Sequence, residues 1–346
     1  MSSSRELDFP QEIAWTSINT IRALAMDAVE QAQSGHPGTP MALAPAAYVL
    51  WTRFLRHNPE NPDWADRDRF VLSCGHASML LYSVLHLSGY DLSLDDIKAF
   101  RQWGSRTPGH PERGHTPGVE TTTGPLGQGF GNAVGMAIAE RFLSDHFNRS
   151  QHAIIDHQTW AFASDGDLME GVASEAASLA GHLRLGKLNV LYDDNHITID
   201  GDTALSFSED VAGRFQAYGW HVVRVADGND LSAIAAAYHA AKAETSRPSL
   251  IILRTVIADP APTKRNTAEA HGAPLGAEEV RRTKEIMGWP VEPKFHVPDE
   301  ALADWRRAVS RGAELESDWR SRVDAYARAY PLAAVELEQW LSGTLP

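Results

Sequence analysis

The chain has 346 residues, of which 43% are hydrophobic and 22% are charged, the balance of an ordinary soluble globular protein. Its formal net charge of −14 argues against nucleic acid or an anionic membrane as the main partner, because both attract positive charge. The single cysteine, Cys74, excludes an intrachain disulfide. No apolar run approaches the roughly eighteen residues of a membrane span, and the N-terminus lacks a signal-peptide core, so we expect a cytoplasmic location.

Two helices and a strand are predicted before residue 75. Apolar residues recur at helical spacing over residues 12–33, and Gly and Pro interrupt this pattern at residues 34–38. Residues 41–54 read as a second, largely buried helix. Residues 69–73 are typical of a short buried strand, which runs into Gly75 and His76.

Residues 103–131 form a different kind of segment. They are rich in Gly, Pro and Thr, contain two histidines and show little apolar periodicity. A loop of this length inside a domain is usually functional. It leads into an apolar helix predicted for residues 132–142.

The clearest pattern is a β-α-β unit, which implies parallel strands. It has a strand at residues 159–163, a turn at 164–167, a helix at 170–182 and a strand at 188–192. The alternation continues with a strand at 222–225, a helix at 231–244 and a strand at 250–257. We therefore expect an α/β fold with a mostly parallel sheet and helices on both faces.

The chain changes character near residue 277. We expect residues 1–276 to form the main domain and residues 277–346 to be a linker and a helical extension. Residues 289–293 are the linker, and residues 298–343 are charged, rich in Ala and Arg, and helical. Three tryptophans of this extension are expected to pack against the rest of the protein: Trp305, Trp319 and Trp340.

Asp165 and Asn195 follow two neighbouring predicted strands. Ligands of parallel sheets bind beyond the carboxyl ends of the strands, where His76 and the segment after Ile257 are also predicted to lie. Carboxylate and amide oxygens suit Mg²⁺ or Ca²⁺, and the helix between the two strands can face an anion with its N-terminus. A metal-bound diphosphate is therefore the natural ligand. The alternative is that Asp165 only caps the helix and Asn195 only starts a turn.

Several motifs then resemble one family. Ser164-Asp165-Gly166, with Asn195 thirty residues after the Asp, resembles the thiamine-diphosphate motif that begins Gly-Asp-Gly and ends in Asn. From residue 12 to about residue 290 the chain resembles the N-terminal half of transketolase, or the N-terminal subunit of a split transketolase. The α subunit of pyruvate dehydrogenase would share the metal motif but not the histidines. The other matching segments are residues 34–38, 66–73, 107–112, 120–129 and 271–276.

The resemblance implies a role for each matching residue. Asp165, Asn195 and the carbonyl of Ile197 would hold the metal. His36, His110 and His271 would bind the sugar hydroxyls and move protons, which suits a side chain that titrates near neutral pH. His76 and His271 would approach the diphosphate, and Gly124 and Leu126 would line the aminopyrimidine through the backbone. The remaining residues would be Ile199 and Ile257 as apolar packing, Gly166 within the motif, and Glu170 in a carboxylate network that reaches the partner half.

Two departures from the family pattern affect this site. Ser164 replaces the first Gly of the motif and is expected to be tolerated if its φ is negative. After Ile257, where the family shows a Gly-x-Gly-like stretch, this chain has Ala258-Asp259-Pro260. A carboxylate there would need either solvent or the pair Lys264 and Arg265 to offset its charge.

The resemblance covers only the first half of a transketolase. The second half carries the pyrimidine-binding domain, with the Glu that protonates the aminopyrimidine. We therefore expect one subunit of a two-component enzyme, an α₂β₂ assembly with a homodimeric core, that transfers a two-carbon ketol unit from a ketose phosphate to an aldose phosphate. The rival is a fragment of a longer gene product. Alternative functions are a related enzyme of a specialised biosynthetic pathway and, ranked low, a non-catalytic scaffold.

Overall fold

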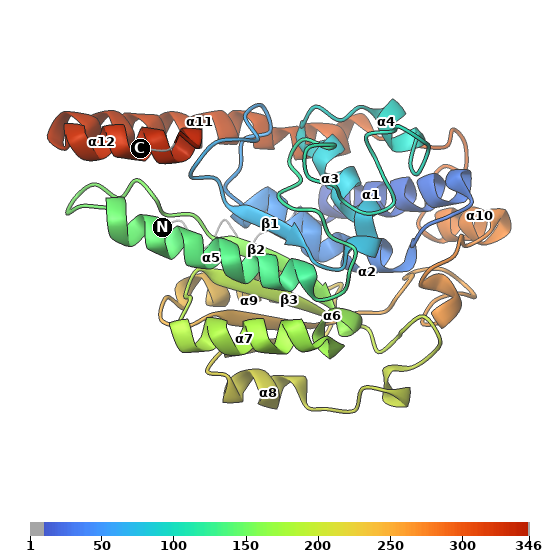
Figure 1. Cartoon of the computed structure of the whole chain (residues 1–346). Coiled ribbons are helices and arrows are strands. Elements are labelled where there is room, and N and C mark those ends of the chain that lie inside the picture. Colours follow the sequence, from blue (N-terminus) through green and yellow to red (C-terminus); the bar gives the residue numbers. More distant parts are fainter. Residues whose placement is uncertain (1–9, 345–346) are drawn as a thin grey trace.

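A five-stranded sheet, in which every strand runs parallel to its neighbours, forms the middle of three layers (Figure 1). This computed structural model describes residues 10–344. The strand order is β1-β2-β3-β5-β4. The strands are β1 Arg69–Leu72, β2 Thr159–Ser164, β3 Leu188–Asp194, β4 His221–Val225 and β5 Ser249–Arg254. The expected α/β fold with a parallel sheet is confirmed.

Side chains that alternate along each strand feed two separate cores. On β2, Trp160 and Phe162 enter one core, while Ala161 and Ala163 enter the other. The first core is covered by α1 (Gln11–Ala32), α2 (Gly38–Val49), α3 (Ser78–Ser88) and α9 (Leu231–Ala243). The second is covered by α5 (Gln128–Phe147), α7 (Gly171–Leu183) and α8 (Val211–Ala217). Helices therefore cover both faces of the sheet (Figure 1).

Several predicted boundaries were wrong, each for a local reason. The helix predicted at 132–142 is α5, which begins four residues earlier because Gly127 adopts a left-handed conformation (φ 78°) at its N-cap. The turn predicted at 164–167 is the short helix α6 (Asp165–Met169), closed by a capping box between Ser164 and Asp167. The strand predicted at 250–257 ends at Arg254. The helix predicted to end at residue 54 finishes as a π-helical turn, Leu50–Phe54, after α2.

The C-terminal helices pack on the first core and on α5. α11 (Asp299–Ala329) lies against α1 and α3, and α12 (Pro331–Ser342) folds back on it (Figure 1). Trp305 is buried against Tyr48, with ring centroids 5.6 Å apart, and Trp319 is buried against Trp64. Trp340 is half-exposed and stacks on Phe142 of α5. The predicted packing of these tryptophans is confirmed. The remaining helices are α4 (Leu94–Lys98) and α10 (Ala277–Ile286).

Within residues 10–344 no helix is long and apolar enough to cross a membrane. The expectation that the chain begins without a signal-peptide core concerns mainly residues 1–9, which lie outside the described residues. Cys74 is buried and free.

Candidate active site

Asp165 and Asn195 lie at the same end of the sheet, just beyond the carboxyl ends of the neighbouring strands β2 and β3. The register of β2 and β3 pairs Ser164 with Asp193, so Asp165 lies one residue past this pair on one strand and Asn195 two residues past it on the other. Both side chains are buried. The predicted position of both residues just beyond the carboxyl ends of neighbouring strands is confirmed.

The Asp165 carboxylate has one oxygen without a hydrogen-bond partner. Oδ1 accepts a short hydrogen bond from the hydroxyl of Tyr192, whereas Oδ2 is buried and finds no partner among the described residues. Burial raises the pKa of Asp165 to about 7, and the nearby carboxylates of Asp193 and Asp194 contribute to the rise. A bare oxygen in a negative surrounding favours a cation.

The amide of Asn195 is held in one orientation. Its Nδ2 donates to Oδ2 of Asp193 over 2.7 Å, and its Oδ1 accepts from the backbone N–H of Ile197 over 2.8 Å. Oδ1 of Asp193 in turn accepts a short hydrogen bond from the hydroxyl of Thr255, the residue that directly follows β5. This chain of contacts fixes which atom of the amide is the acceptor.

Asp167 joins the site's loops and was not predicted. Its Oδ1 accepts from the hydroxyl of Ser73 (2.7 Å) and from the backbone N–H of Gly127 (2.8 Å). Its Oδ2 accepts from the backbone N–H of Ser164 over 2.9 Å. One buried carboxylate therefore connects the ends of β1 and β2 with the glycine-rich loop before α5.

The four predicted histidines form one cluster. The rings of His76 and His271 stack with centroids 4.9 Å apart. The ring of His36 lies 5.1 Å from His76, 5.7 Å from His271 and 6.5 Å from His110. The structure thus brings together side chains separated by up to 235 positions, on loops that follow α1, β1 and β5 and on the loop before α5.

Burial keeps these imidazoles neutral near pH 7. It lowers the pKa of His36 to about 4, with smaller contributions from His271, Arg101 and His110. Burial also lowers the pKa of His76, His110 and His271. Nε2 of His76 and Nδ1 of His271 are buried and have no hydrogen-bond partner among the described residues. Two ring nitrogens are therefore free to meet a ligand.

Glycines allow the loops around the cluster to approach one another. Gly124 has φ 142°, and a Cβ at this position would lie 3.1 Å from the ring of His110. A Cβ on Gly38 would lie 2.5 Å from the carbonyl oxygen of Ala270 and 2.6 Å from the side chain of Ile257. Ile257 is fully buried beside this contact.

Three predicted cofactor or partner contacts are on the surface. Leu126 is 38% exposed and Ile199 is 68% exposed. Glu170 is exposed and adjoins Gly127, where an added Cβ would lie 2.9 Å from the Cβ of Glu170. Gly166 lies beside the Leu126 side chain. These residues surround the site without closing it.

The departures from the family pattern are accommodated. Ser164 has φ −118°, as required. Asp259 is paired with Arg265, whose Nε donates over 2.7 Å, and also with Arg22 at 3.5 Å. Of the two expected cations, Arg265 pairs with Asp259, whereas Nζ of Lys264 donates to the carbonyl of Pro274 over 3.4 Å.

Sequence reasoning also missed Arg101, Asp193 and Thr255. Nη1 of Arg101 donates to the hydroxyl of Ser34 over 2.9 Å, and Nη2 lies 3.5 Å from Nδ1 of His36. Nothing in the local sequence distinguishes Arg101 from an ordinary surface arginine. Asp193 precedes Asn195 by two residues, and the run Asp193-Asp194-Asn195 at a strand end was the available signal.

The donor set fits a metal that is shared with a phosphate ligand. No group of three or more His, Cys, Asp or Glu side chains in residues 10–344 is arranged to hold a metal ion. The predicted set has a single carboxylate, an amide and a backbone carbonyl, which leaves coordination positions of a hard cation for phosphate oxygens and water. The free Oδ2 of Asp165 agrees with this arrangement.

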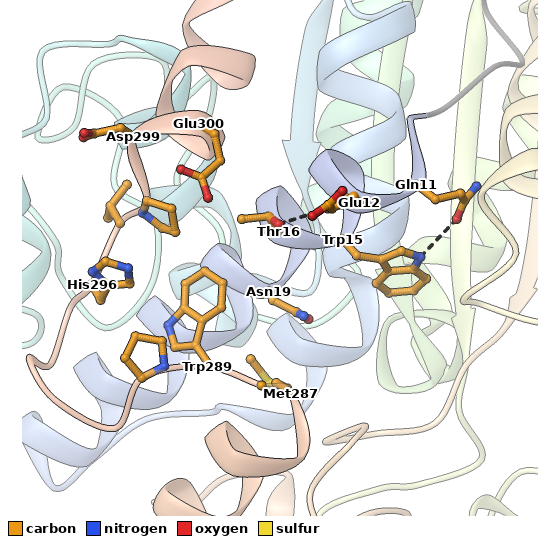
Figure 2. Close-up of a pocket in the computed structure, with 14 residues that line it drawn as sticks. Gln11, Glu12, Trp15, Thr16, Asn19, Met287, Trp289, His296, Asp299 and Glu300 are labelled. Carbon is orange, nitrogen blue, oxygen red and sulfur yellow. Dashed lines mark hydrogen bonds between the residues drawn. The ribbon is translucent and has the colours of Figure 1, made fainter.

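A separate surface pocket lies between the start of α1 and the connection from α10 to α11 (Figure 2). Trp15, Met287, Trp289 and His296 contribute to its walls. None of the predicted site residues lines it.

Comparisons with known proteins agree on one family. The family described as "Transketolase, thiamine diphosphate binding domain" matches residues 13–346. The transketolase of Geobacillus stearothermophilus is 59% identical over 331 residues, which are 95% of this chain and 50% of that protein. Transketolase 1 of Escherichia coli K12 is 54% identical over the whole chain and 50% of its own length. The chain therefore spans about half the length of these curated relatives.

Solved structures give the same result. Transketolase from Leishmania mexicana matches with a TM-score of 0.95 and 46% identity, over 96% of this chain and 50% of that one. A Pichia stipitis transketolase in complex with sedoheptulose 7-phosphate matches with a TM-score of 0.95 and 47% identity, over 96% of this chain and 49% of that one. Fold and site thus define a thiamine-diphosphate-binding domain. The chain belongs to the transketolase family, of which it represents the N-terminal half.

Proposed function

We propose that this chain is the cofactor-binding half of a transketolase that transfers a two-carbon ketol unit from a ketose phosphate to an aldose phosphate. The observation that carries the proposal is the buried, unpartnered Oδ2 of Asp165 beside the oriented amide of Asn195. The family match and the clustered histidines support the same reaction.

Asp165, Asn195 and the carbonyl of Ile197 would hold Mg²⁺, or Ca²⁺, together with the diphosphate of thiamine diphosphate. His76 and His271 carry the two free ring nitrogens and would donate hydrogen bonds to this anion as neutral imidazoles. Gly124, Leu126, Gly166, Ile199 and Ile257 would line the rest of the cofactor. When bound, thiamine diphosphate supplies the nucleophilic carbon and the electron sink.

His36, His110 and His271 would bind and orient the sugar. A neutral imidazole can donate from one ring nitrogen and accept at the other, so it can hold a hydroxyl and take its proton. Arg101 lies beside His36 and disfavours its protonated form, which keeps the base available.

The complementary half would come from a partner subunit in an α₂β₂ assembly. Large apolar side chains near the site and on α5 and α7 are 38% to 76% exposed, which is typical of a surface that is covered in an assembly. They are Leu126, Phe142, Val172, Leu179, Ile199 and Leu205. Glu170 would join a carboxylate network across this contact. The division at residues 276 and 277 and the cytoplasmic location stay predictions.

The test is a complementation assay. The purified chain is mixed with a protein that carries the complementary half of a transketolase, thiamine diphosphate and Mg²⁺, and transfer from xylulose 5-phosphate to ribose 5-phosphate is measured. We expect turnover in the mixture, and turnover about a hundredfold lower or less from either part alone. Full turnover from this chain alone would contradict the partner requirement, and turnover only with other acceptors would favour a specialised pathway.

Asp165→Asn and Asn195→Leu are the matched variants for the same assay. Both should retain the fold, because their neighbours are held by other contacts, and both should lose turnover in the mixture. Asp200→Asn, an exposed position in the adjoining loop, is the control and should keep it.

A further inference from the structure

The loop that carries His271 has few large apolar side chains to hold it in place. Residues 257–276, here called the His271 loop, contribute Ala258, Ala261, Ala270 and Leu275 to a small buried cluster. Burial of a methyl group stabilises by far less than burial of a Leu side chain. The polar contacts of the loop therefore decide where His271 lies.

Asp259 makes three side-chain contacts outside its own turn. Its Oδ1 accepts from Nε of Arg265 over 2.7 Å. Its Oδ2 accepts from Nδ2 of Asn229 over 3.2 Å and lies 3.5 Å from Nη2 of Arg22. Asn229 completes a bridge, because its Oδ1 accepts from the same Nη2 over 3.0 Å. These contacts connect the loop to α1 and to the connection between β4 and α9.

Arg22 is a fixed and nearly inaccessible anchor. Its side chain is 5% exposed, its Nε donates to the carbonyl of Met41 in α2 over 3.1 Å, and its only salt bridge within residues 10–344 is to Asp259. Burial lowers the pKa of Arg22 to about 10, and the carboxylate of Asp259 counteracts this. A buried guanidinium that loses its carboxylate is strongly destabilised, so the two side chains hold each other in place.

The same loop meets the histidine cluster on its other side. The backbone N–H of Ala258 donates to the carbonyl of Gly38 over 3.0 Å, two residues after His36. Gly272 adjoins the ring of His36, and His271 stacks on His76. A displacement of the loop would therefore move His271 and Ile257 together, away from His36 and His76.

We propose that Asp259 is a positioning residue, which ties the His271 loop to the buried Arg22 and so sets the place of His271 and Ile257 at the cofactor. The expected effect on cofactor binding rests on the proposed function. The contacts that hold the His271 loop to Arg22 are a property of this chain alone. Asp259 lies in the Ala258-Asp259-Pro260 stretch, where the resemblance to the family leads us to expect a Gly-x-Gly-like sequence. Asp259 is not among the residues that we propose to contact the cofactor or the sugar.

The first experiment is amide hydrogen exchange on the full chain without ligands. In Asp259→Asn the amides of Asn266, Ala270 and His271, which donate within the loop, should exchange at least about tenfold faster than in the wild type. Amides of β3 should not change. Glu278→Gln, which removes an exposed salt bridge to Arg281 on α10, is the matched control and should leave the loop unchanged.

The second experiment separates positioning from stability. The wild type, Asp259→Asn and the double variant Arg22→Met/Asp259→Asn are each mixed with the complementary half and titrated with thiamine diphosphate at fixed Mg²⁺. We expect the half-saturating cofactor concentration to rise about tenfold in both variants. The thermal midpoint should fall in the single variant and recover by at least half in the double variant, because the buried charge is gone.

Two results would overturn the proposal. The first is an Asp259→Asn variant in which the amide exchange rates of the loop and the half-saturating cofactor concentration both stay within twofold of the wild-type values. The other is a double variant in which half-saturation recovers together with the thermal midpoint, since this would make Asp259 a stabilising residue only. If the wild-type mixture shows no cofactor-dependent turnover, the proposed function fails, and the exchange experiment still decides whether Asp259 ties the loop.

Discussion

At the scale of single residues, the site depends on buried side chains that hydrogen-bond to the predicted metal ligands and hold them in one orientation. Asp193 is not one of the predicted metal or cofactor contacts. It accepts a hydrogen bond from the amide of Asn195 and so fixes the side chain on which the metal would depend. Tyr192 does the same for Asp165 by occupying Oδ1 and leaving Oδ2 free. Residues that hold a metal ligand in place in this way commonly have a large effect on metal affinity.

Asp193→Asn should therefore weaken cofactor binding in the mixture of the two halves. The amide that replaces the carboxylate removes a charge-assisted acceptor, so the Asn195 side chain can rotate. We expect the half-saturating Mg²⁺ concentration to rise about tenfold to a hundredfold at constant thiamine diphosphate. An unchanged value in a variant with normal circular dichroism would show that Asp193 does not orient Asn195.

The histidine cluster predicts a pH dependence of stability. The pKa of His36 is about 4 in the folded chain and near 6.5 in an unfolded one. The unfolded chain therefore binds the proton first as the pH falls, so the free energy of unfolding decreases from about pH 6.5 down to about pH 4. Urea unfolding at pH 7 and pH 5 should show a smaller loss in His36→Asn than in the wild type. Equal losses would mean that His36 titrates normally in the folded chain.

At the scale of elements, the glycine-rich loop before α5 is held against the ends of β1 and β2. Asp167 connects the end of β1, the loop before α5 and the end of β2 with hydrogen bonds from Ser73, Gly127 and Ser164. Each of these bonds reaches a buried acceptor, so no water can replace them without rearrangement.

Asp167→Ala should destabilise the chain. The loss of hydrogen bonds to a buried charged acceptor is expected to lower the free energy of unfolding by about 2–4 kcal/mol. Urea denaturation at pH 7 measures this directly. Asp145→Ala, at an exposed position on α5, is the control, and a comparable loss in both variants would refute a special role for Asp167.

The elements were more predictable than the contacts between them. The strand at 159–164 could be predicted because its alternating side chains face two apolar cores. Asp165 and Asn195 could be predicted because a β-α-β unit fixes which strand ends meet. The start of α5 was missed because it depends on a left-handed glycine. Asp167 was missed because its partners Gly127 and Ser73 lie 40 and 94 positions away, and no local pattern marks them.

At the scale of the whole molecule, several large apolar side chains of the described residues are exposed. The predicted aminopyrimidine contact Leu126 and the apolar side chains of α5 and α7 are uncovered in this half. The chain spans about half the length of its curated relatives, and the proposed function assigns the cover of these side chains to a complementary half.

Leu179→Asp should impair assembly without unfolding the chain. Leu179 is exposed on α7, so a carboxylate there costs little in the isolated chain, but it would be desolvated against a partner. We expect at least about tenfold weaker association with the complementary half by sedimentation. Leu332→Asp on α12 is the matched control. Equal behaviour of the two variants would place the contact elsewhere.

The most direct test of the account is where a divalent ion binds. The chain would be crystallised with its complementary half, thiamine diphosphate and Mn²⁺, and the ion located by its anomalous scattering. We expect one strong peak at about 2.0–2.4 Å from Oδ2 of Asp165, Oδ1 of Asn195 and the carbonyl oxygen of Ile197, with diphosphate oxygens completing the coordination. Diphosphate bound with the ion at another place, or with no ion, would contradict the central claim.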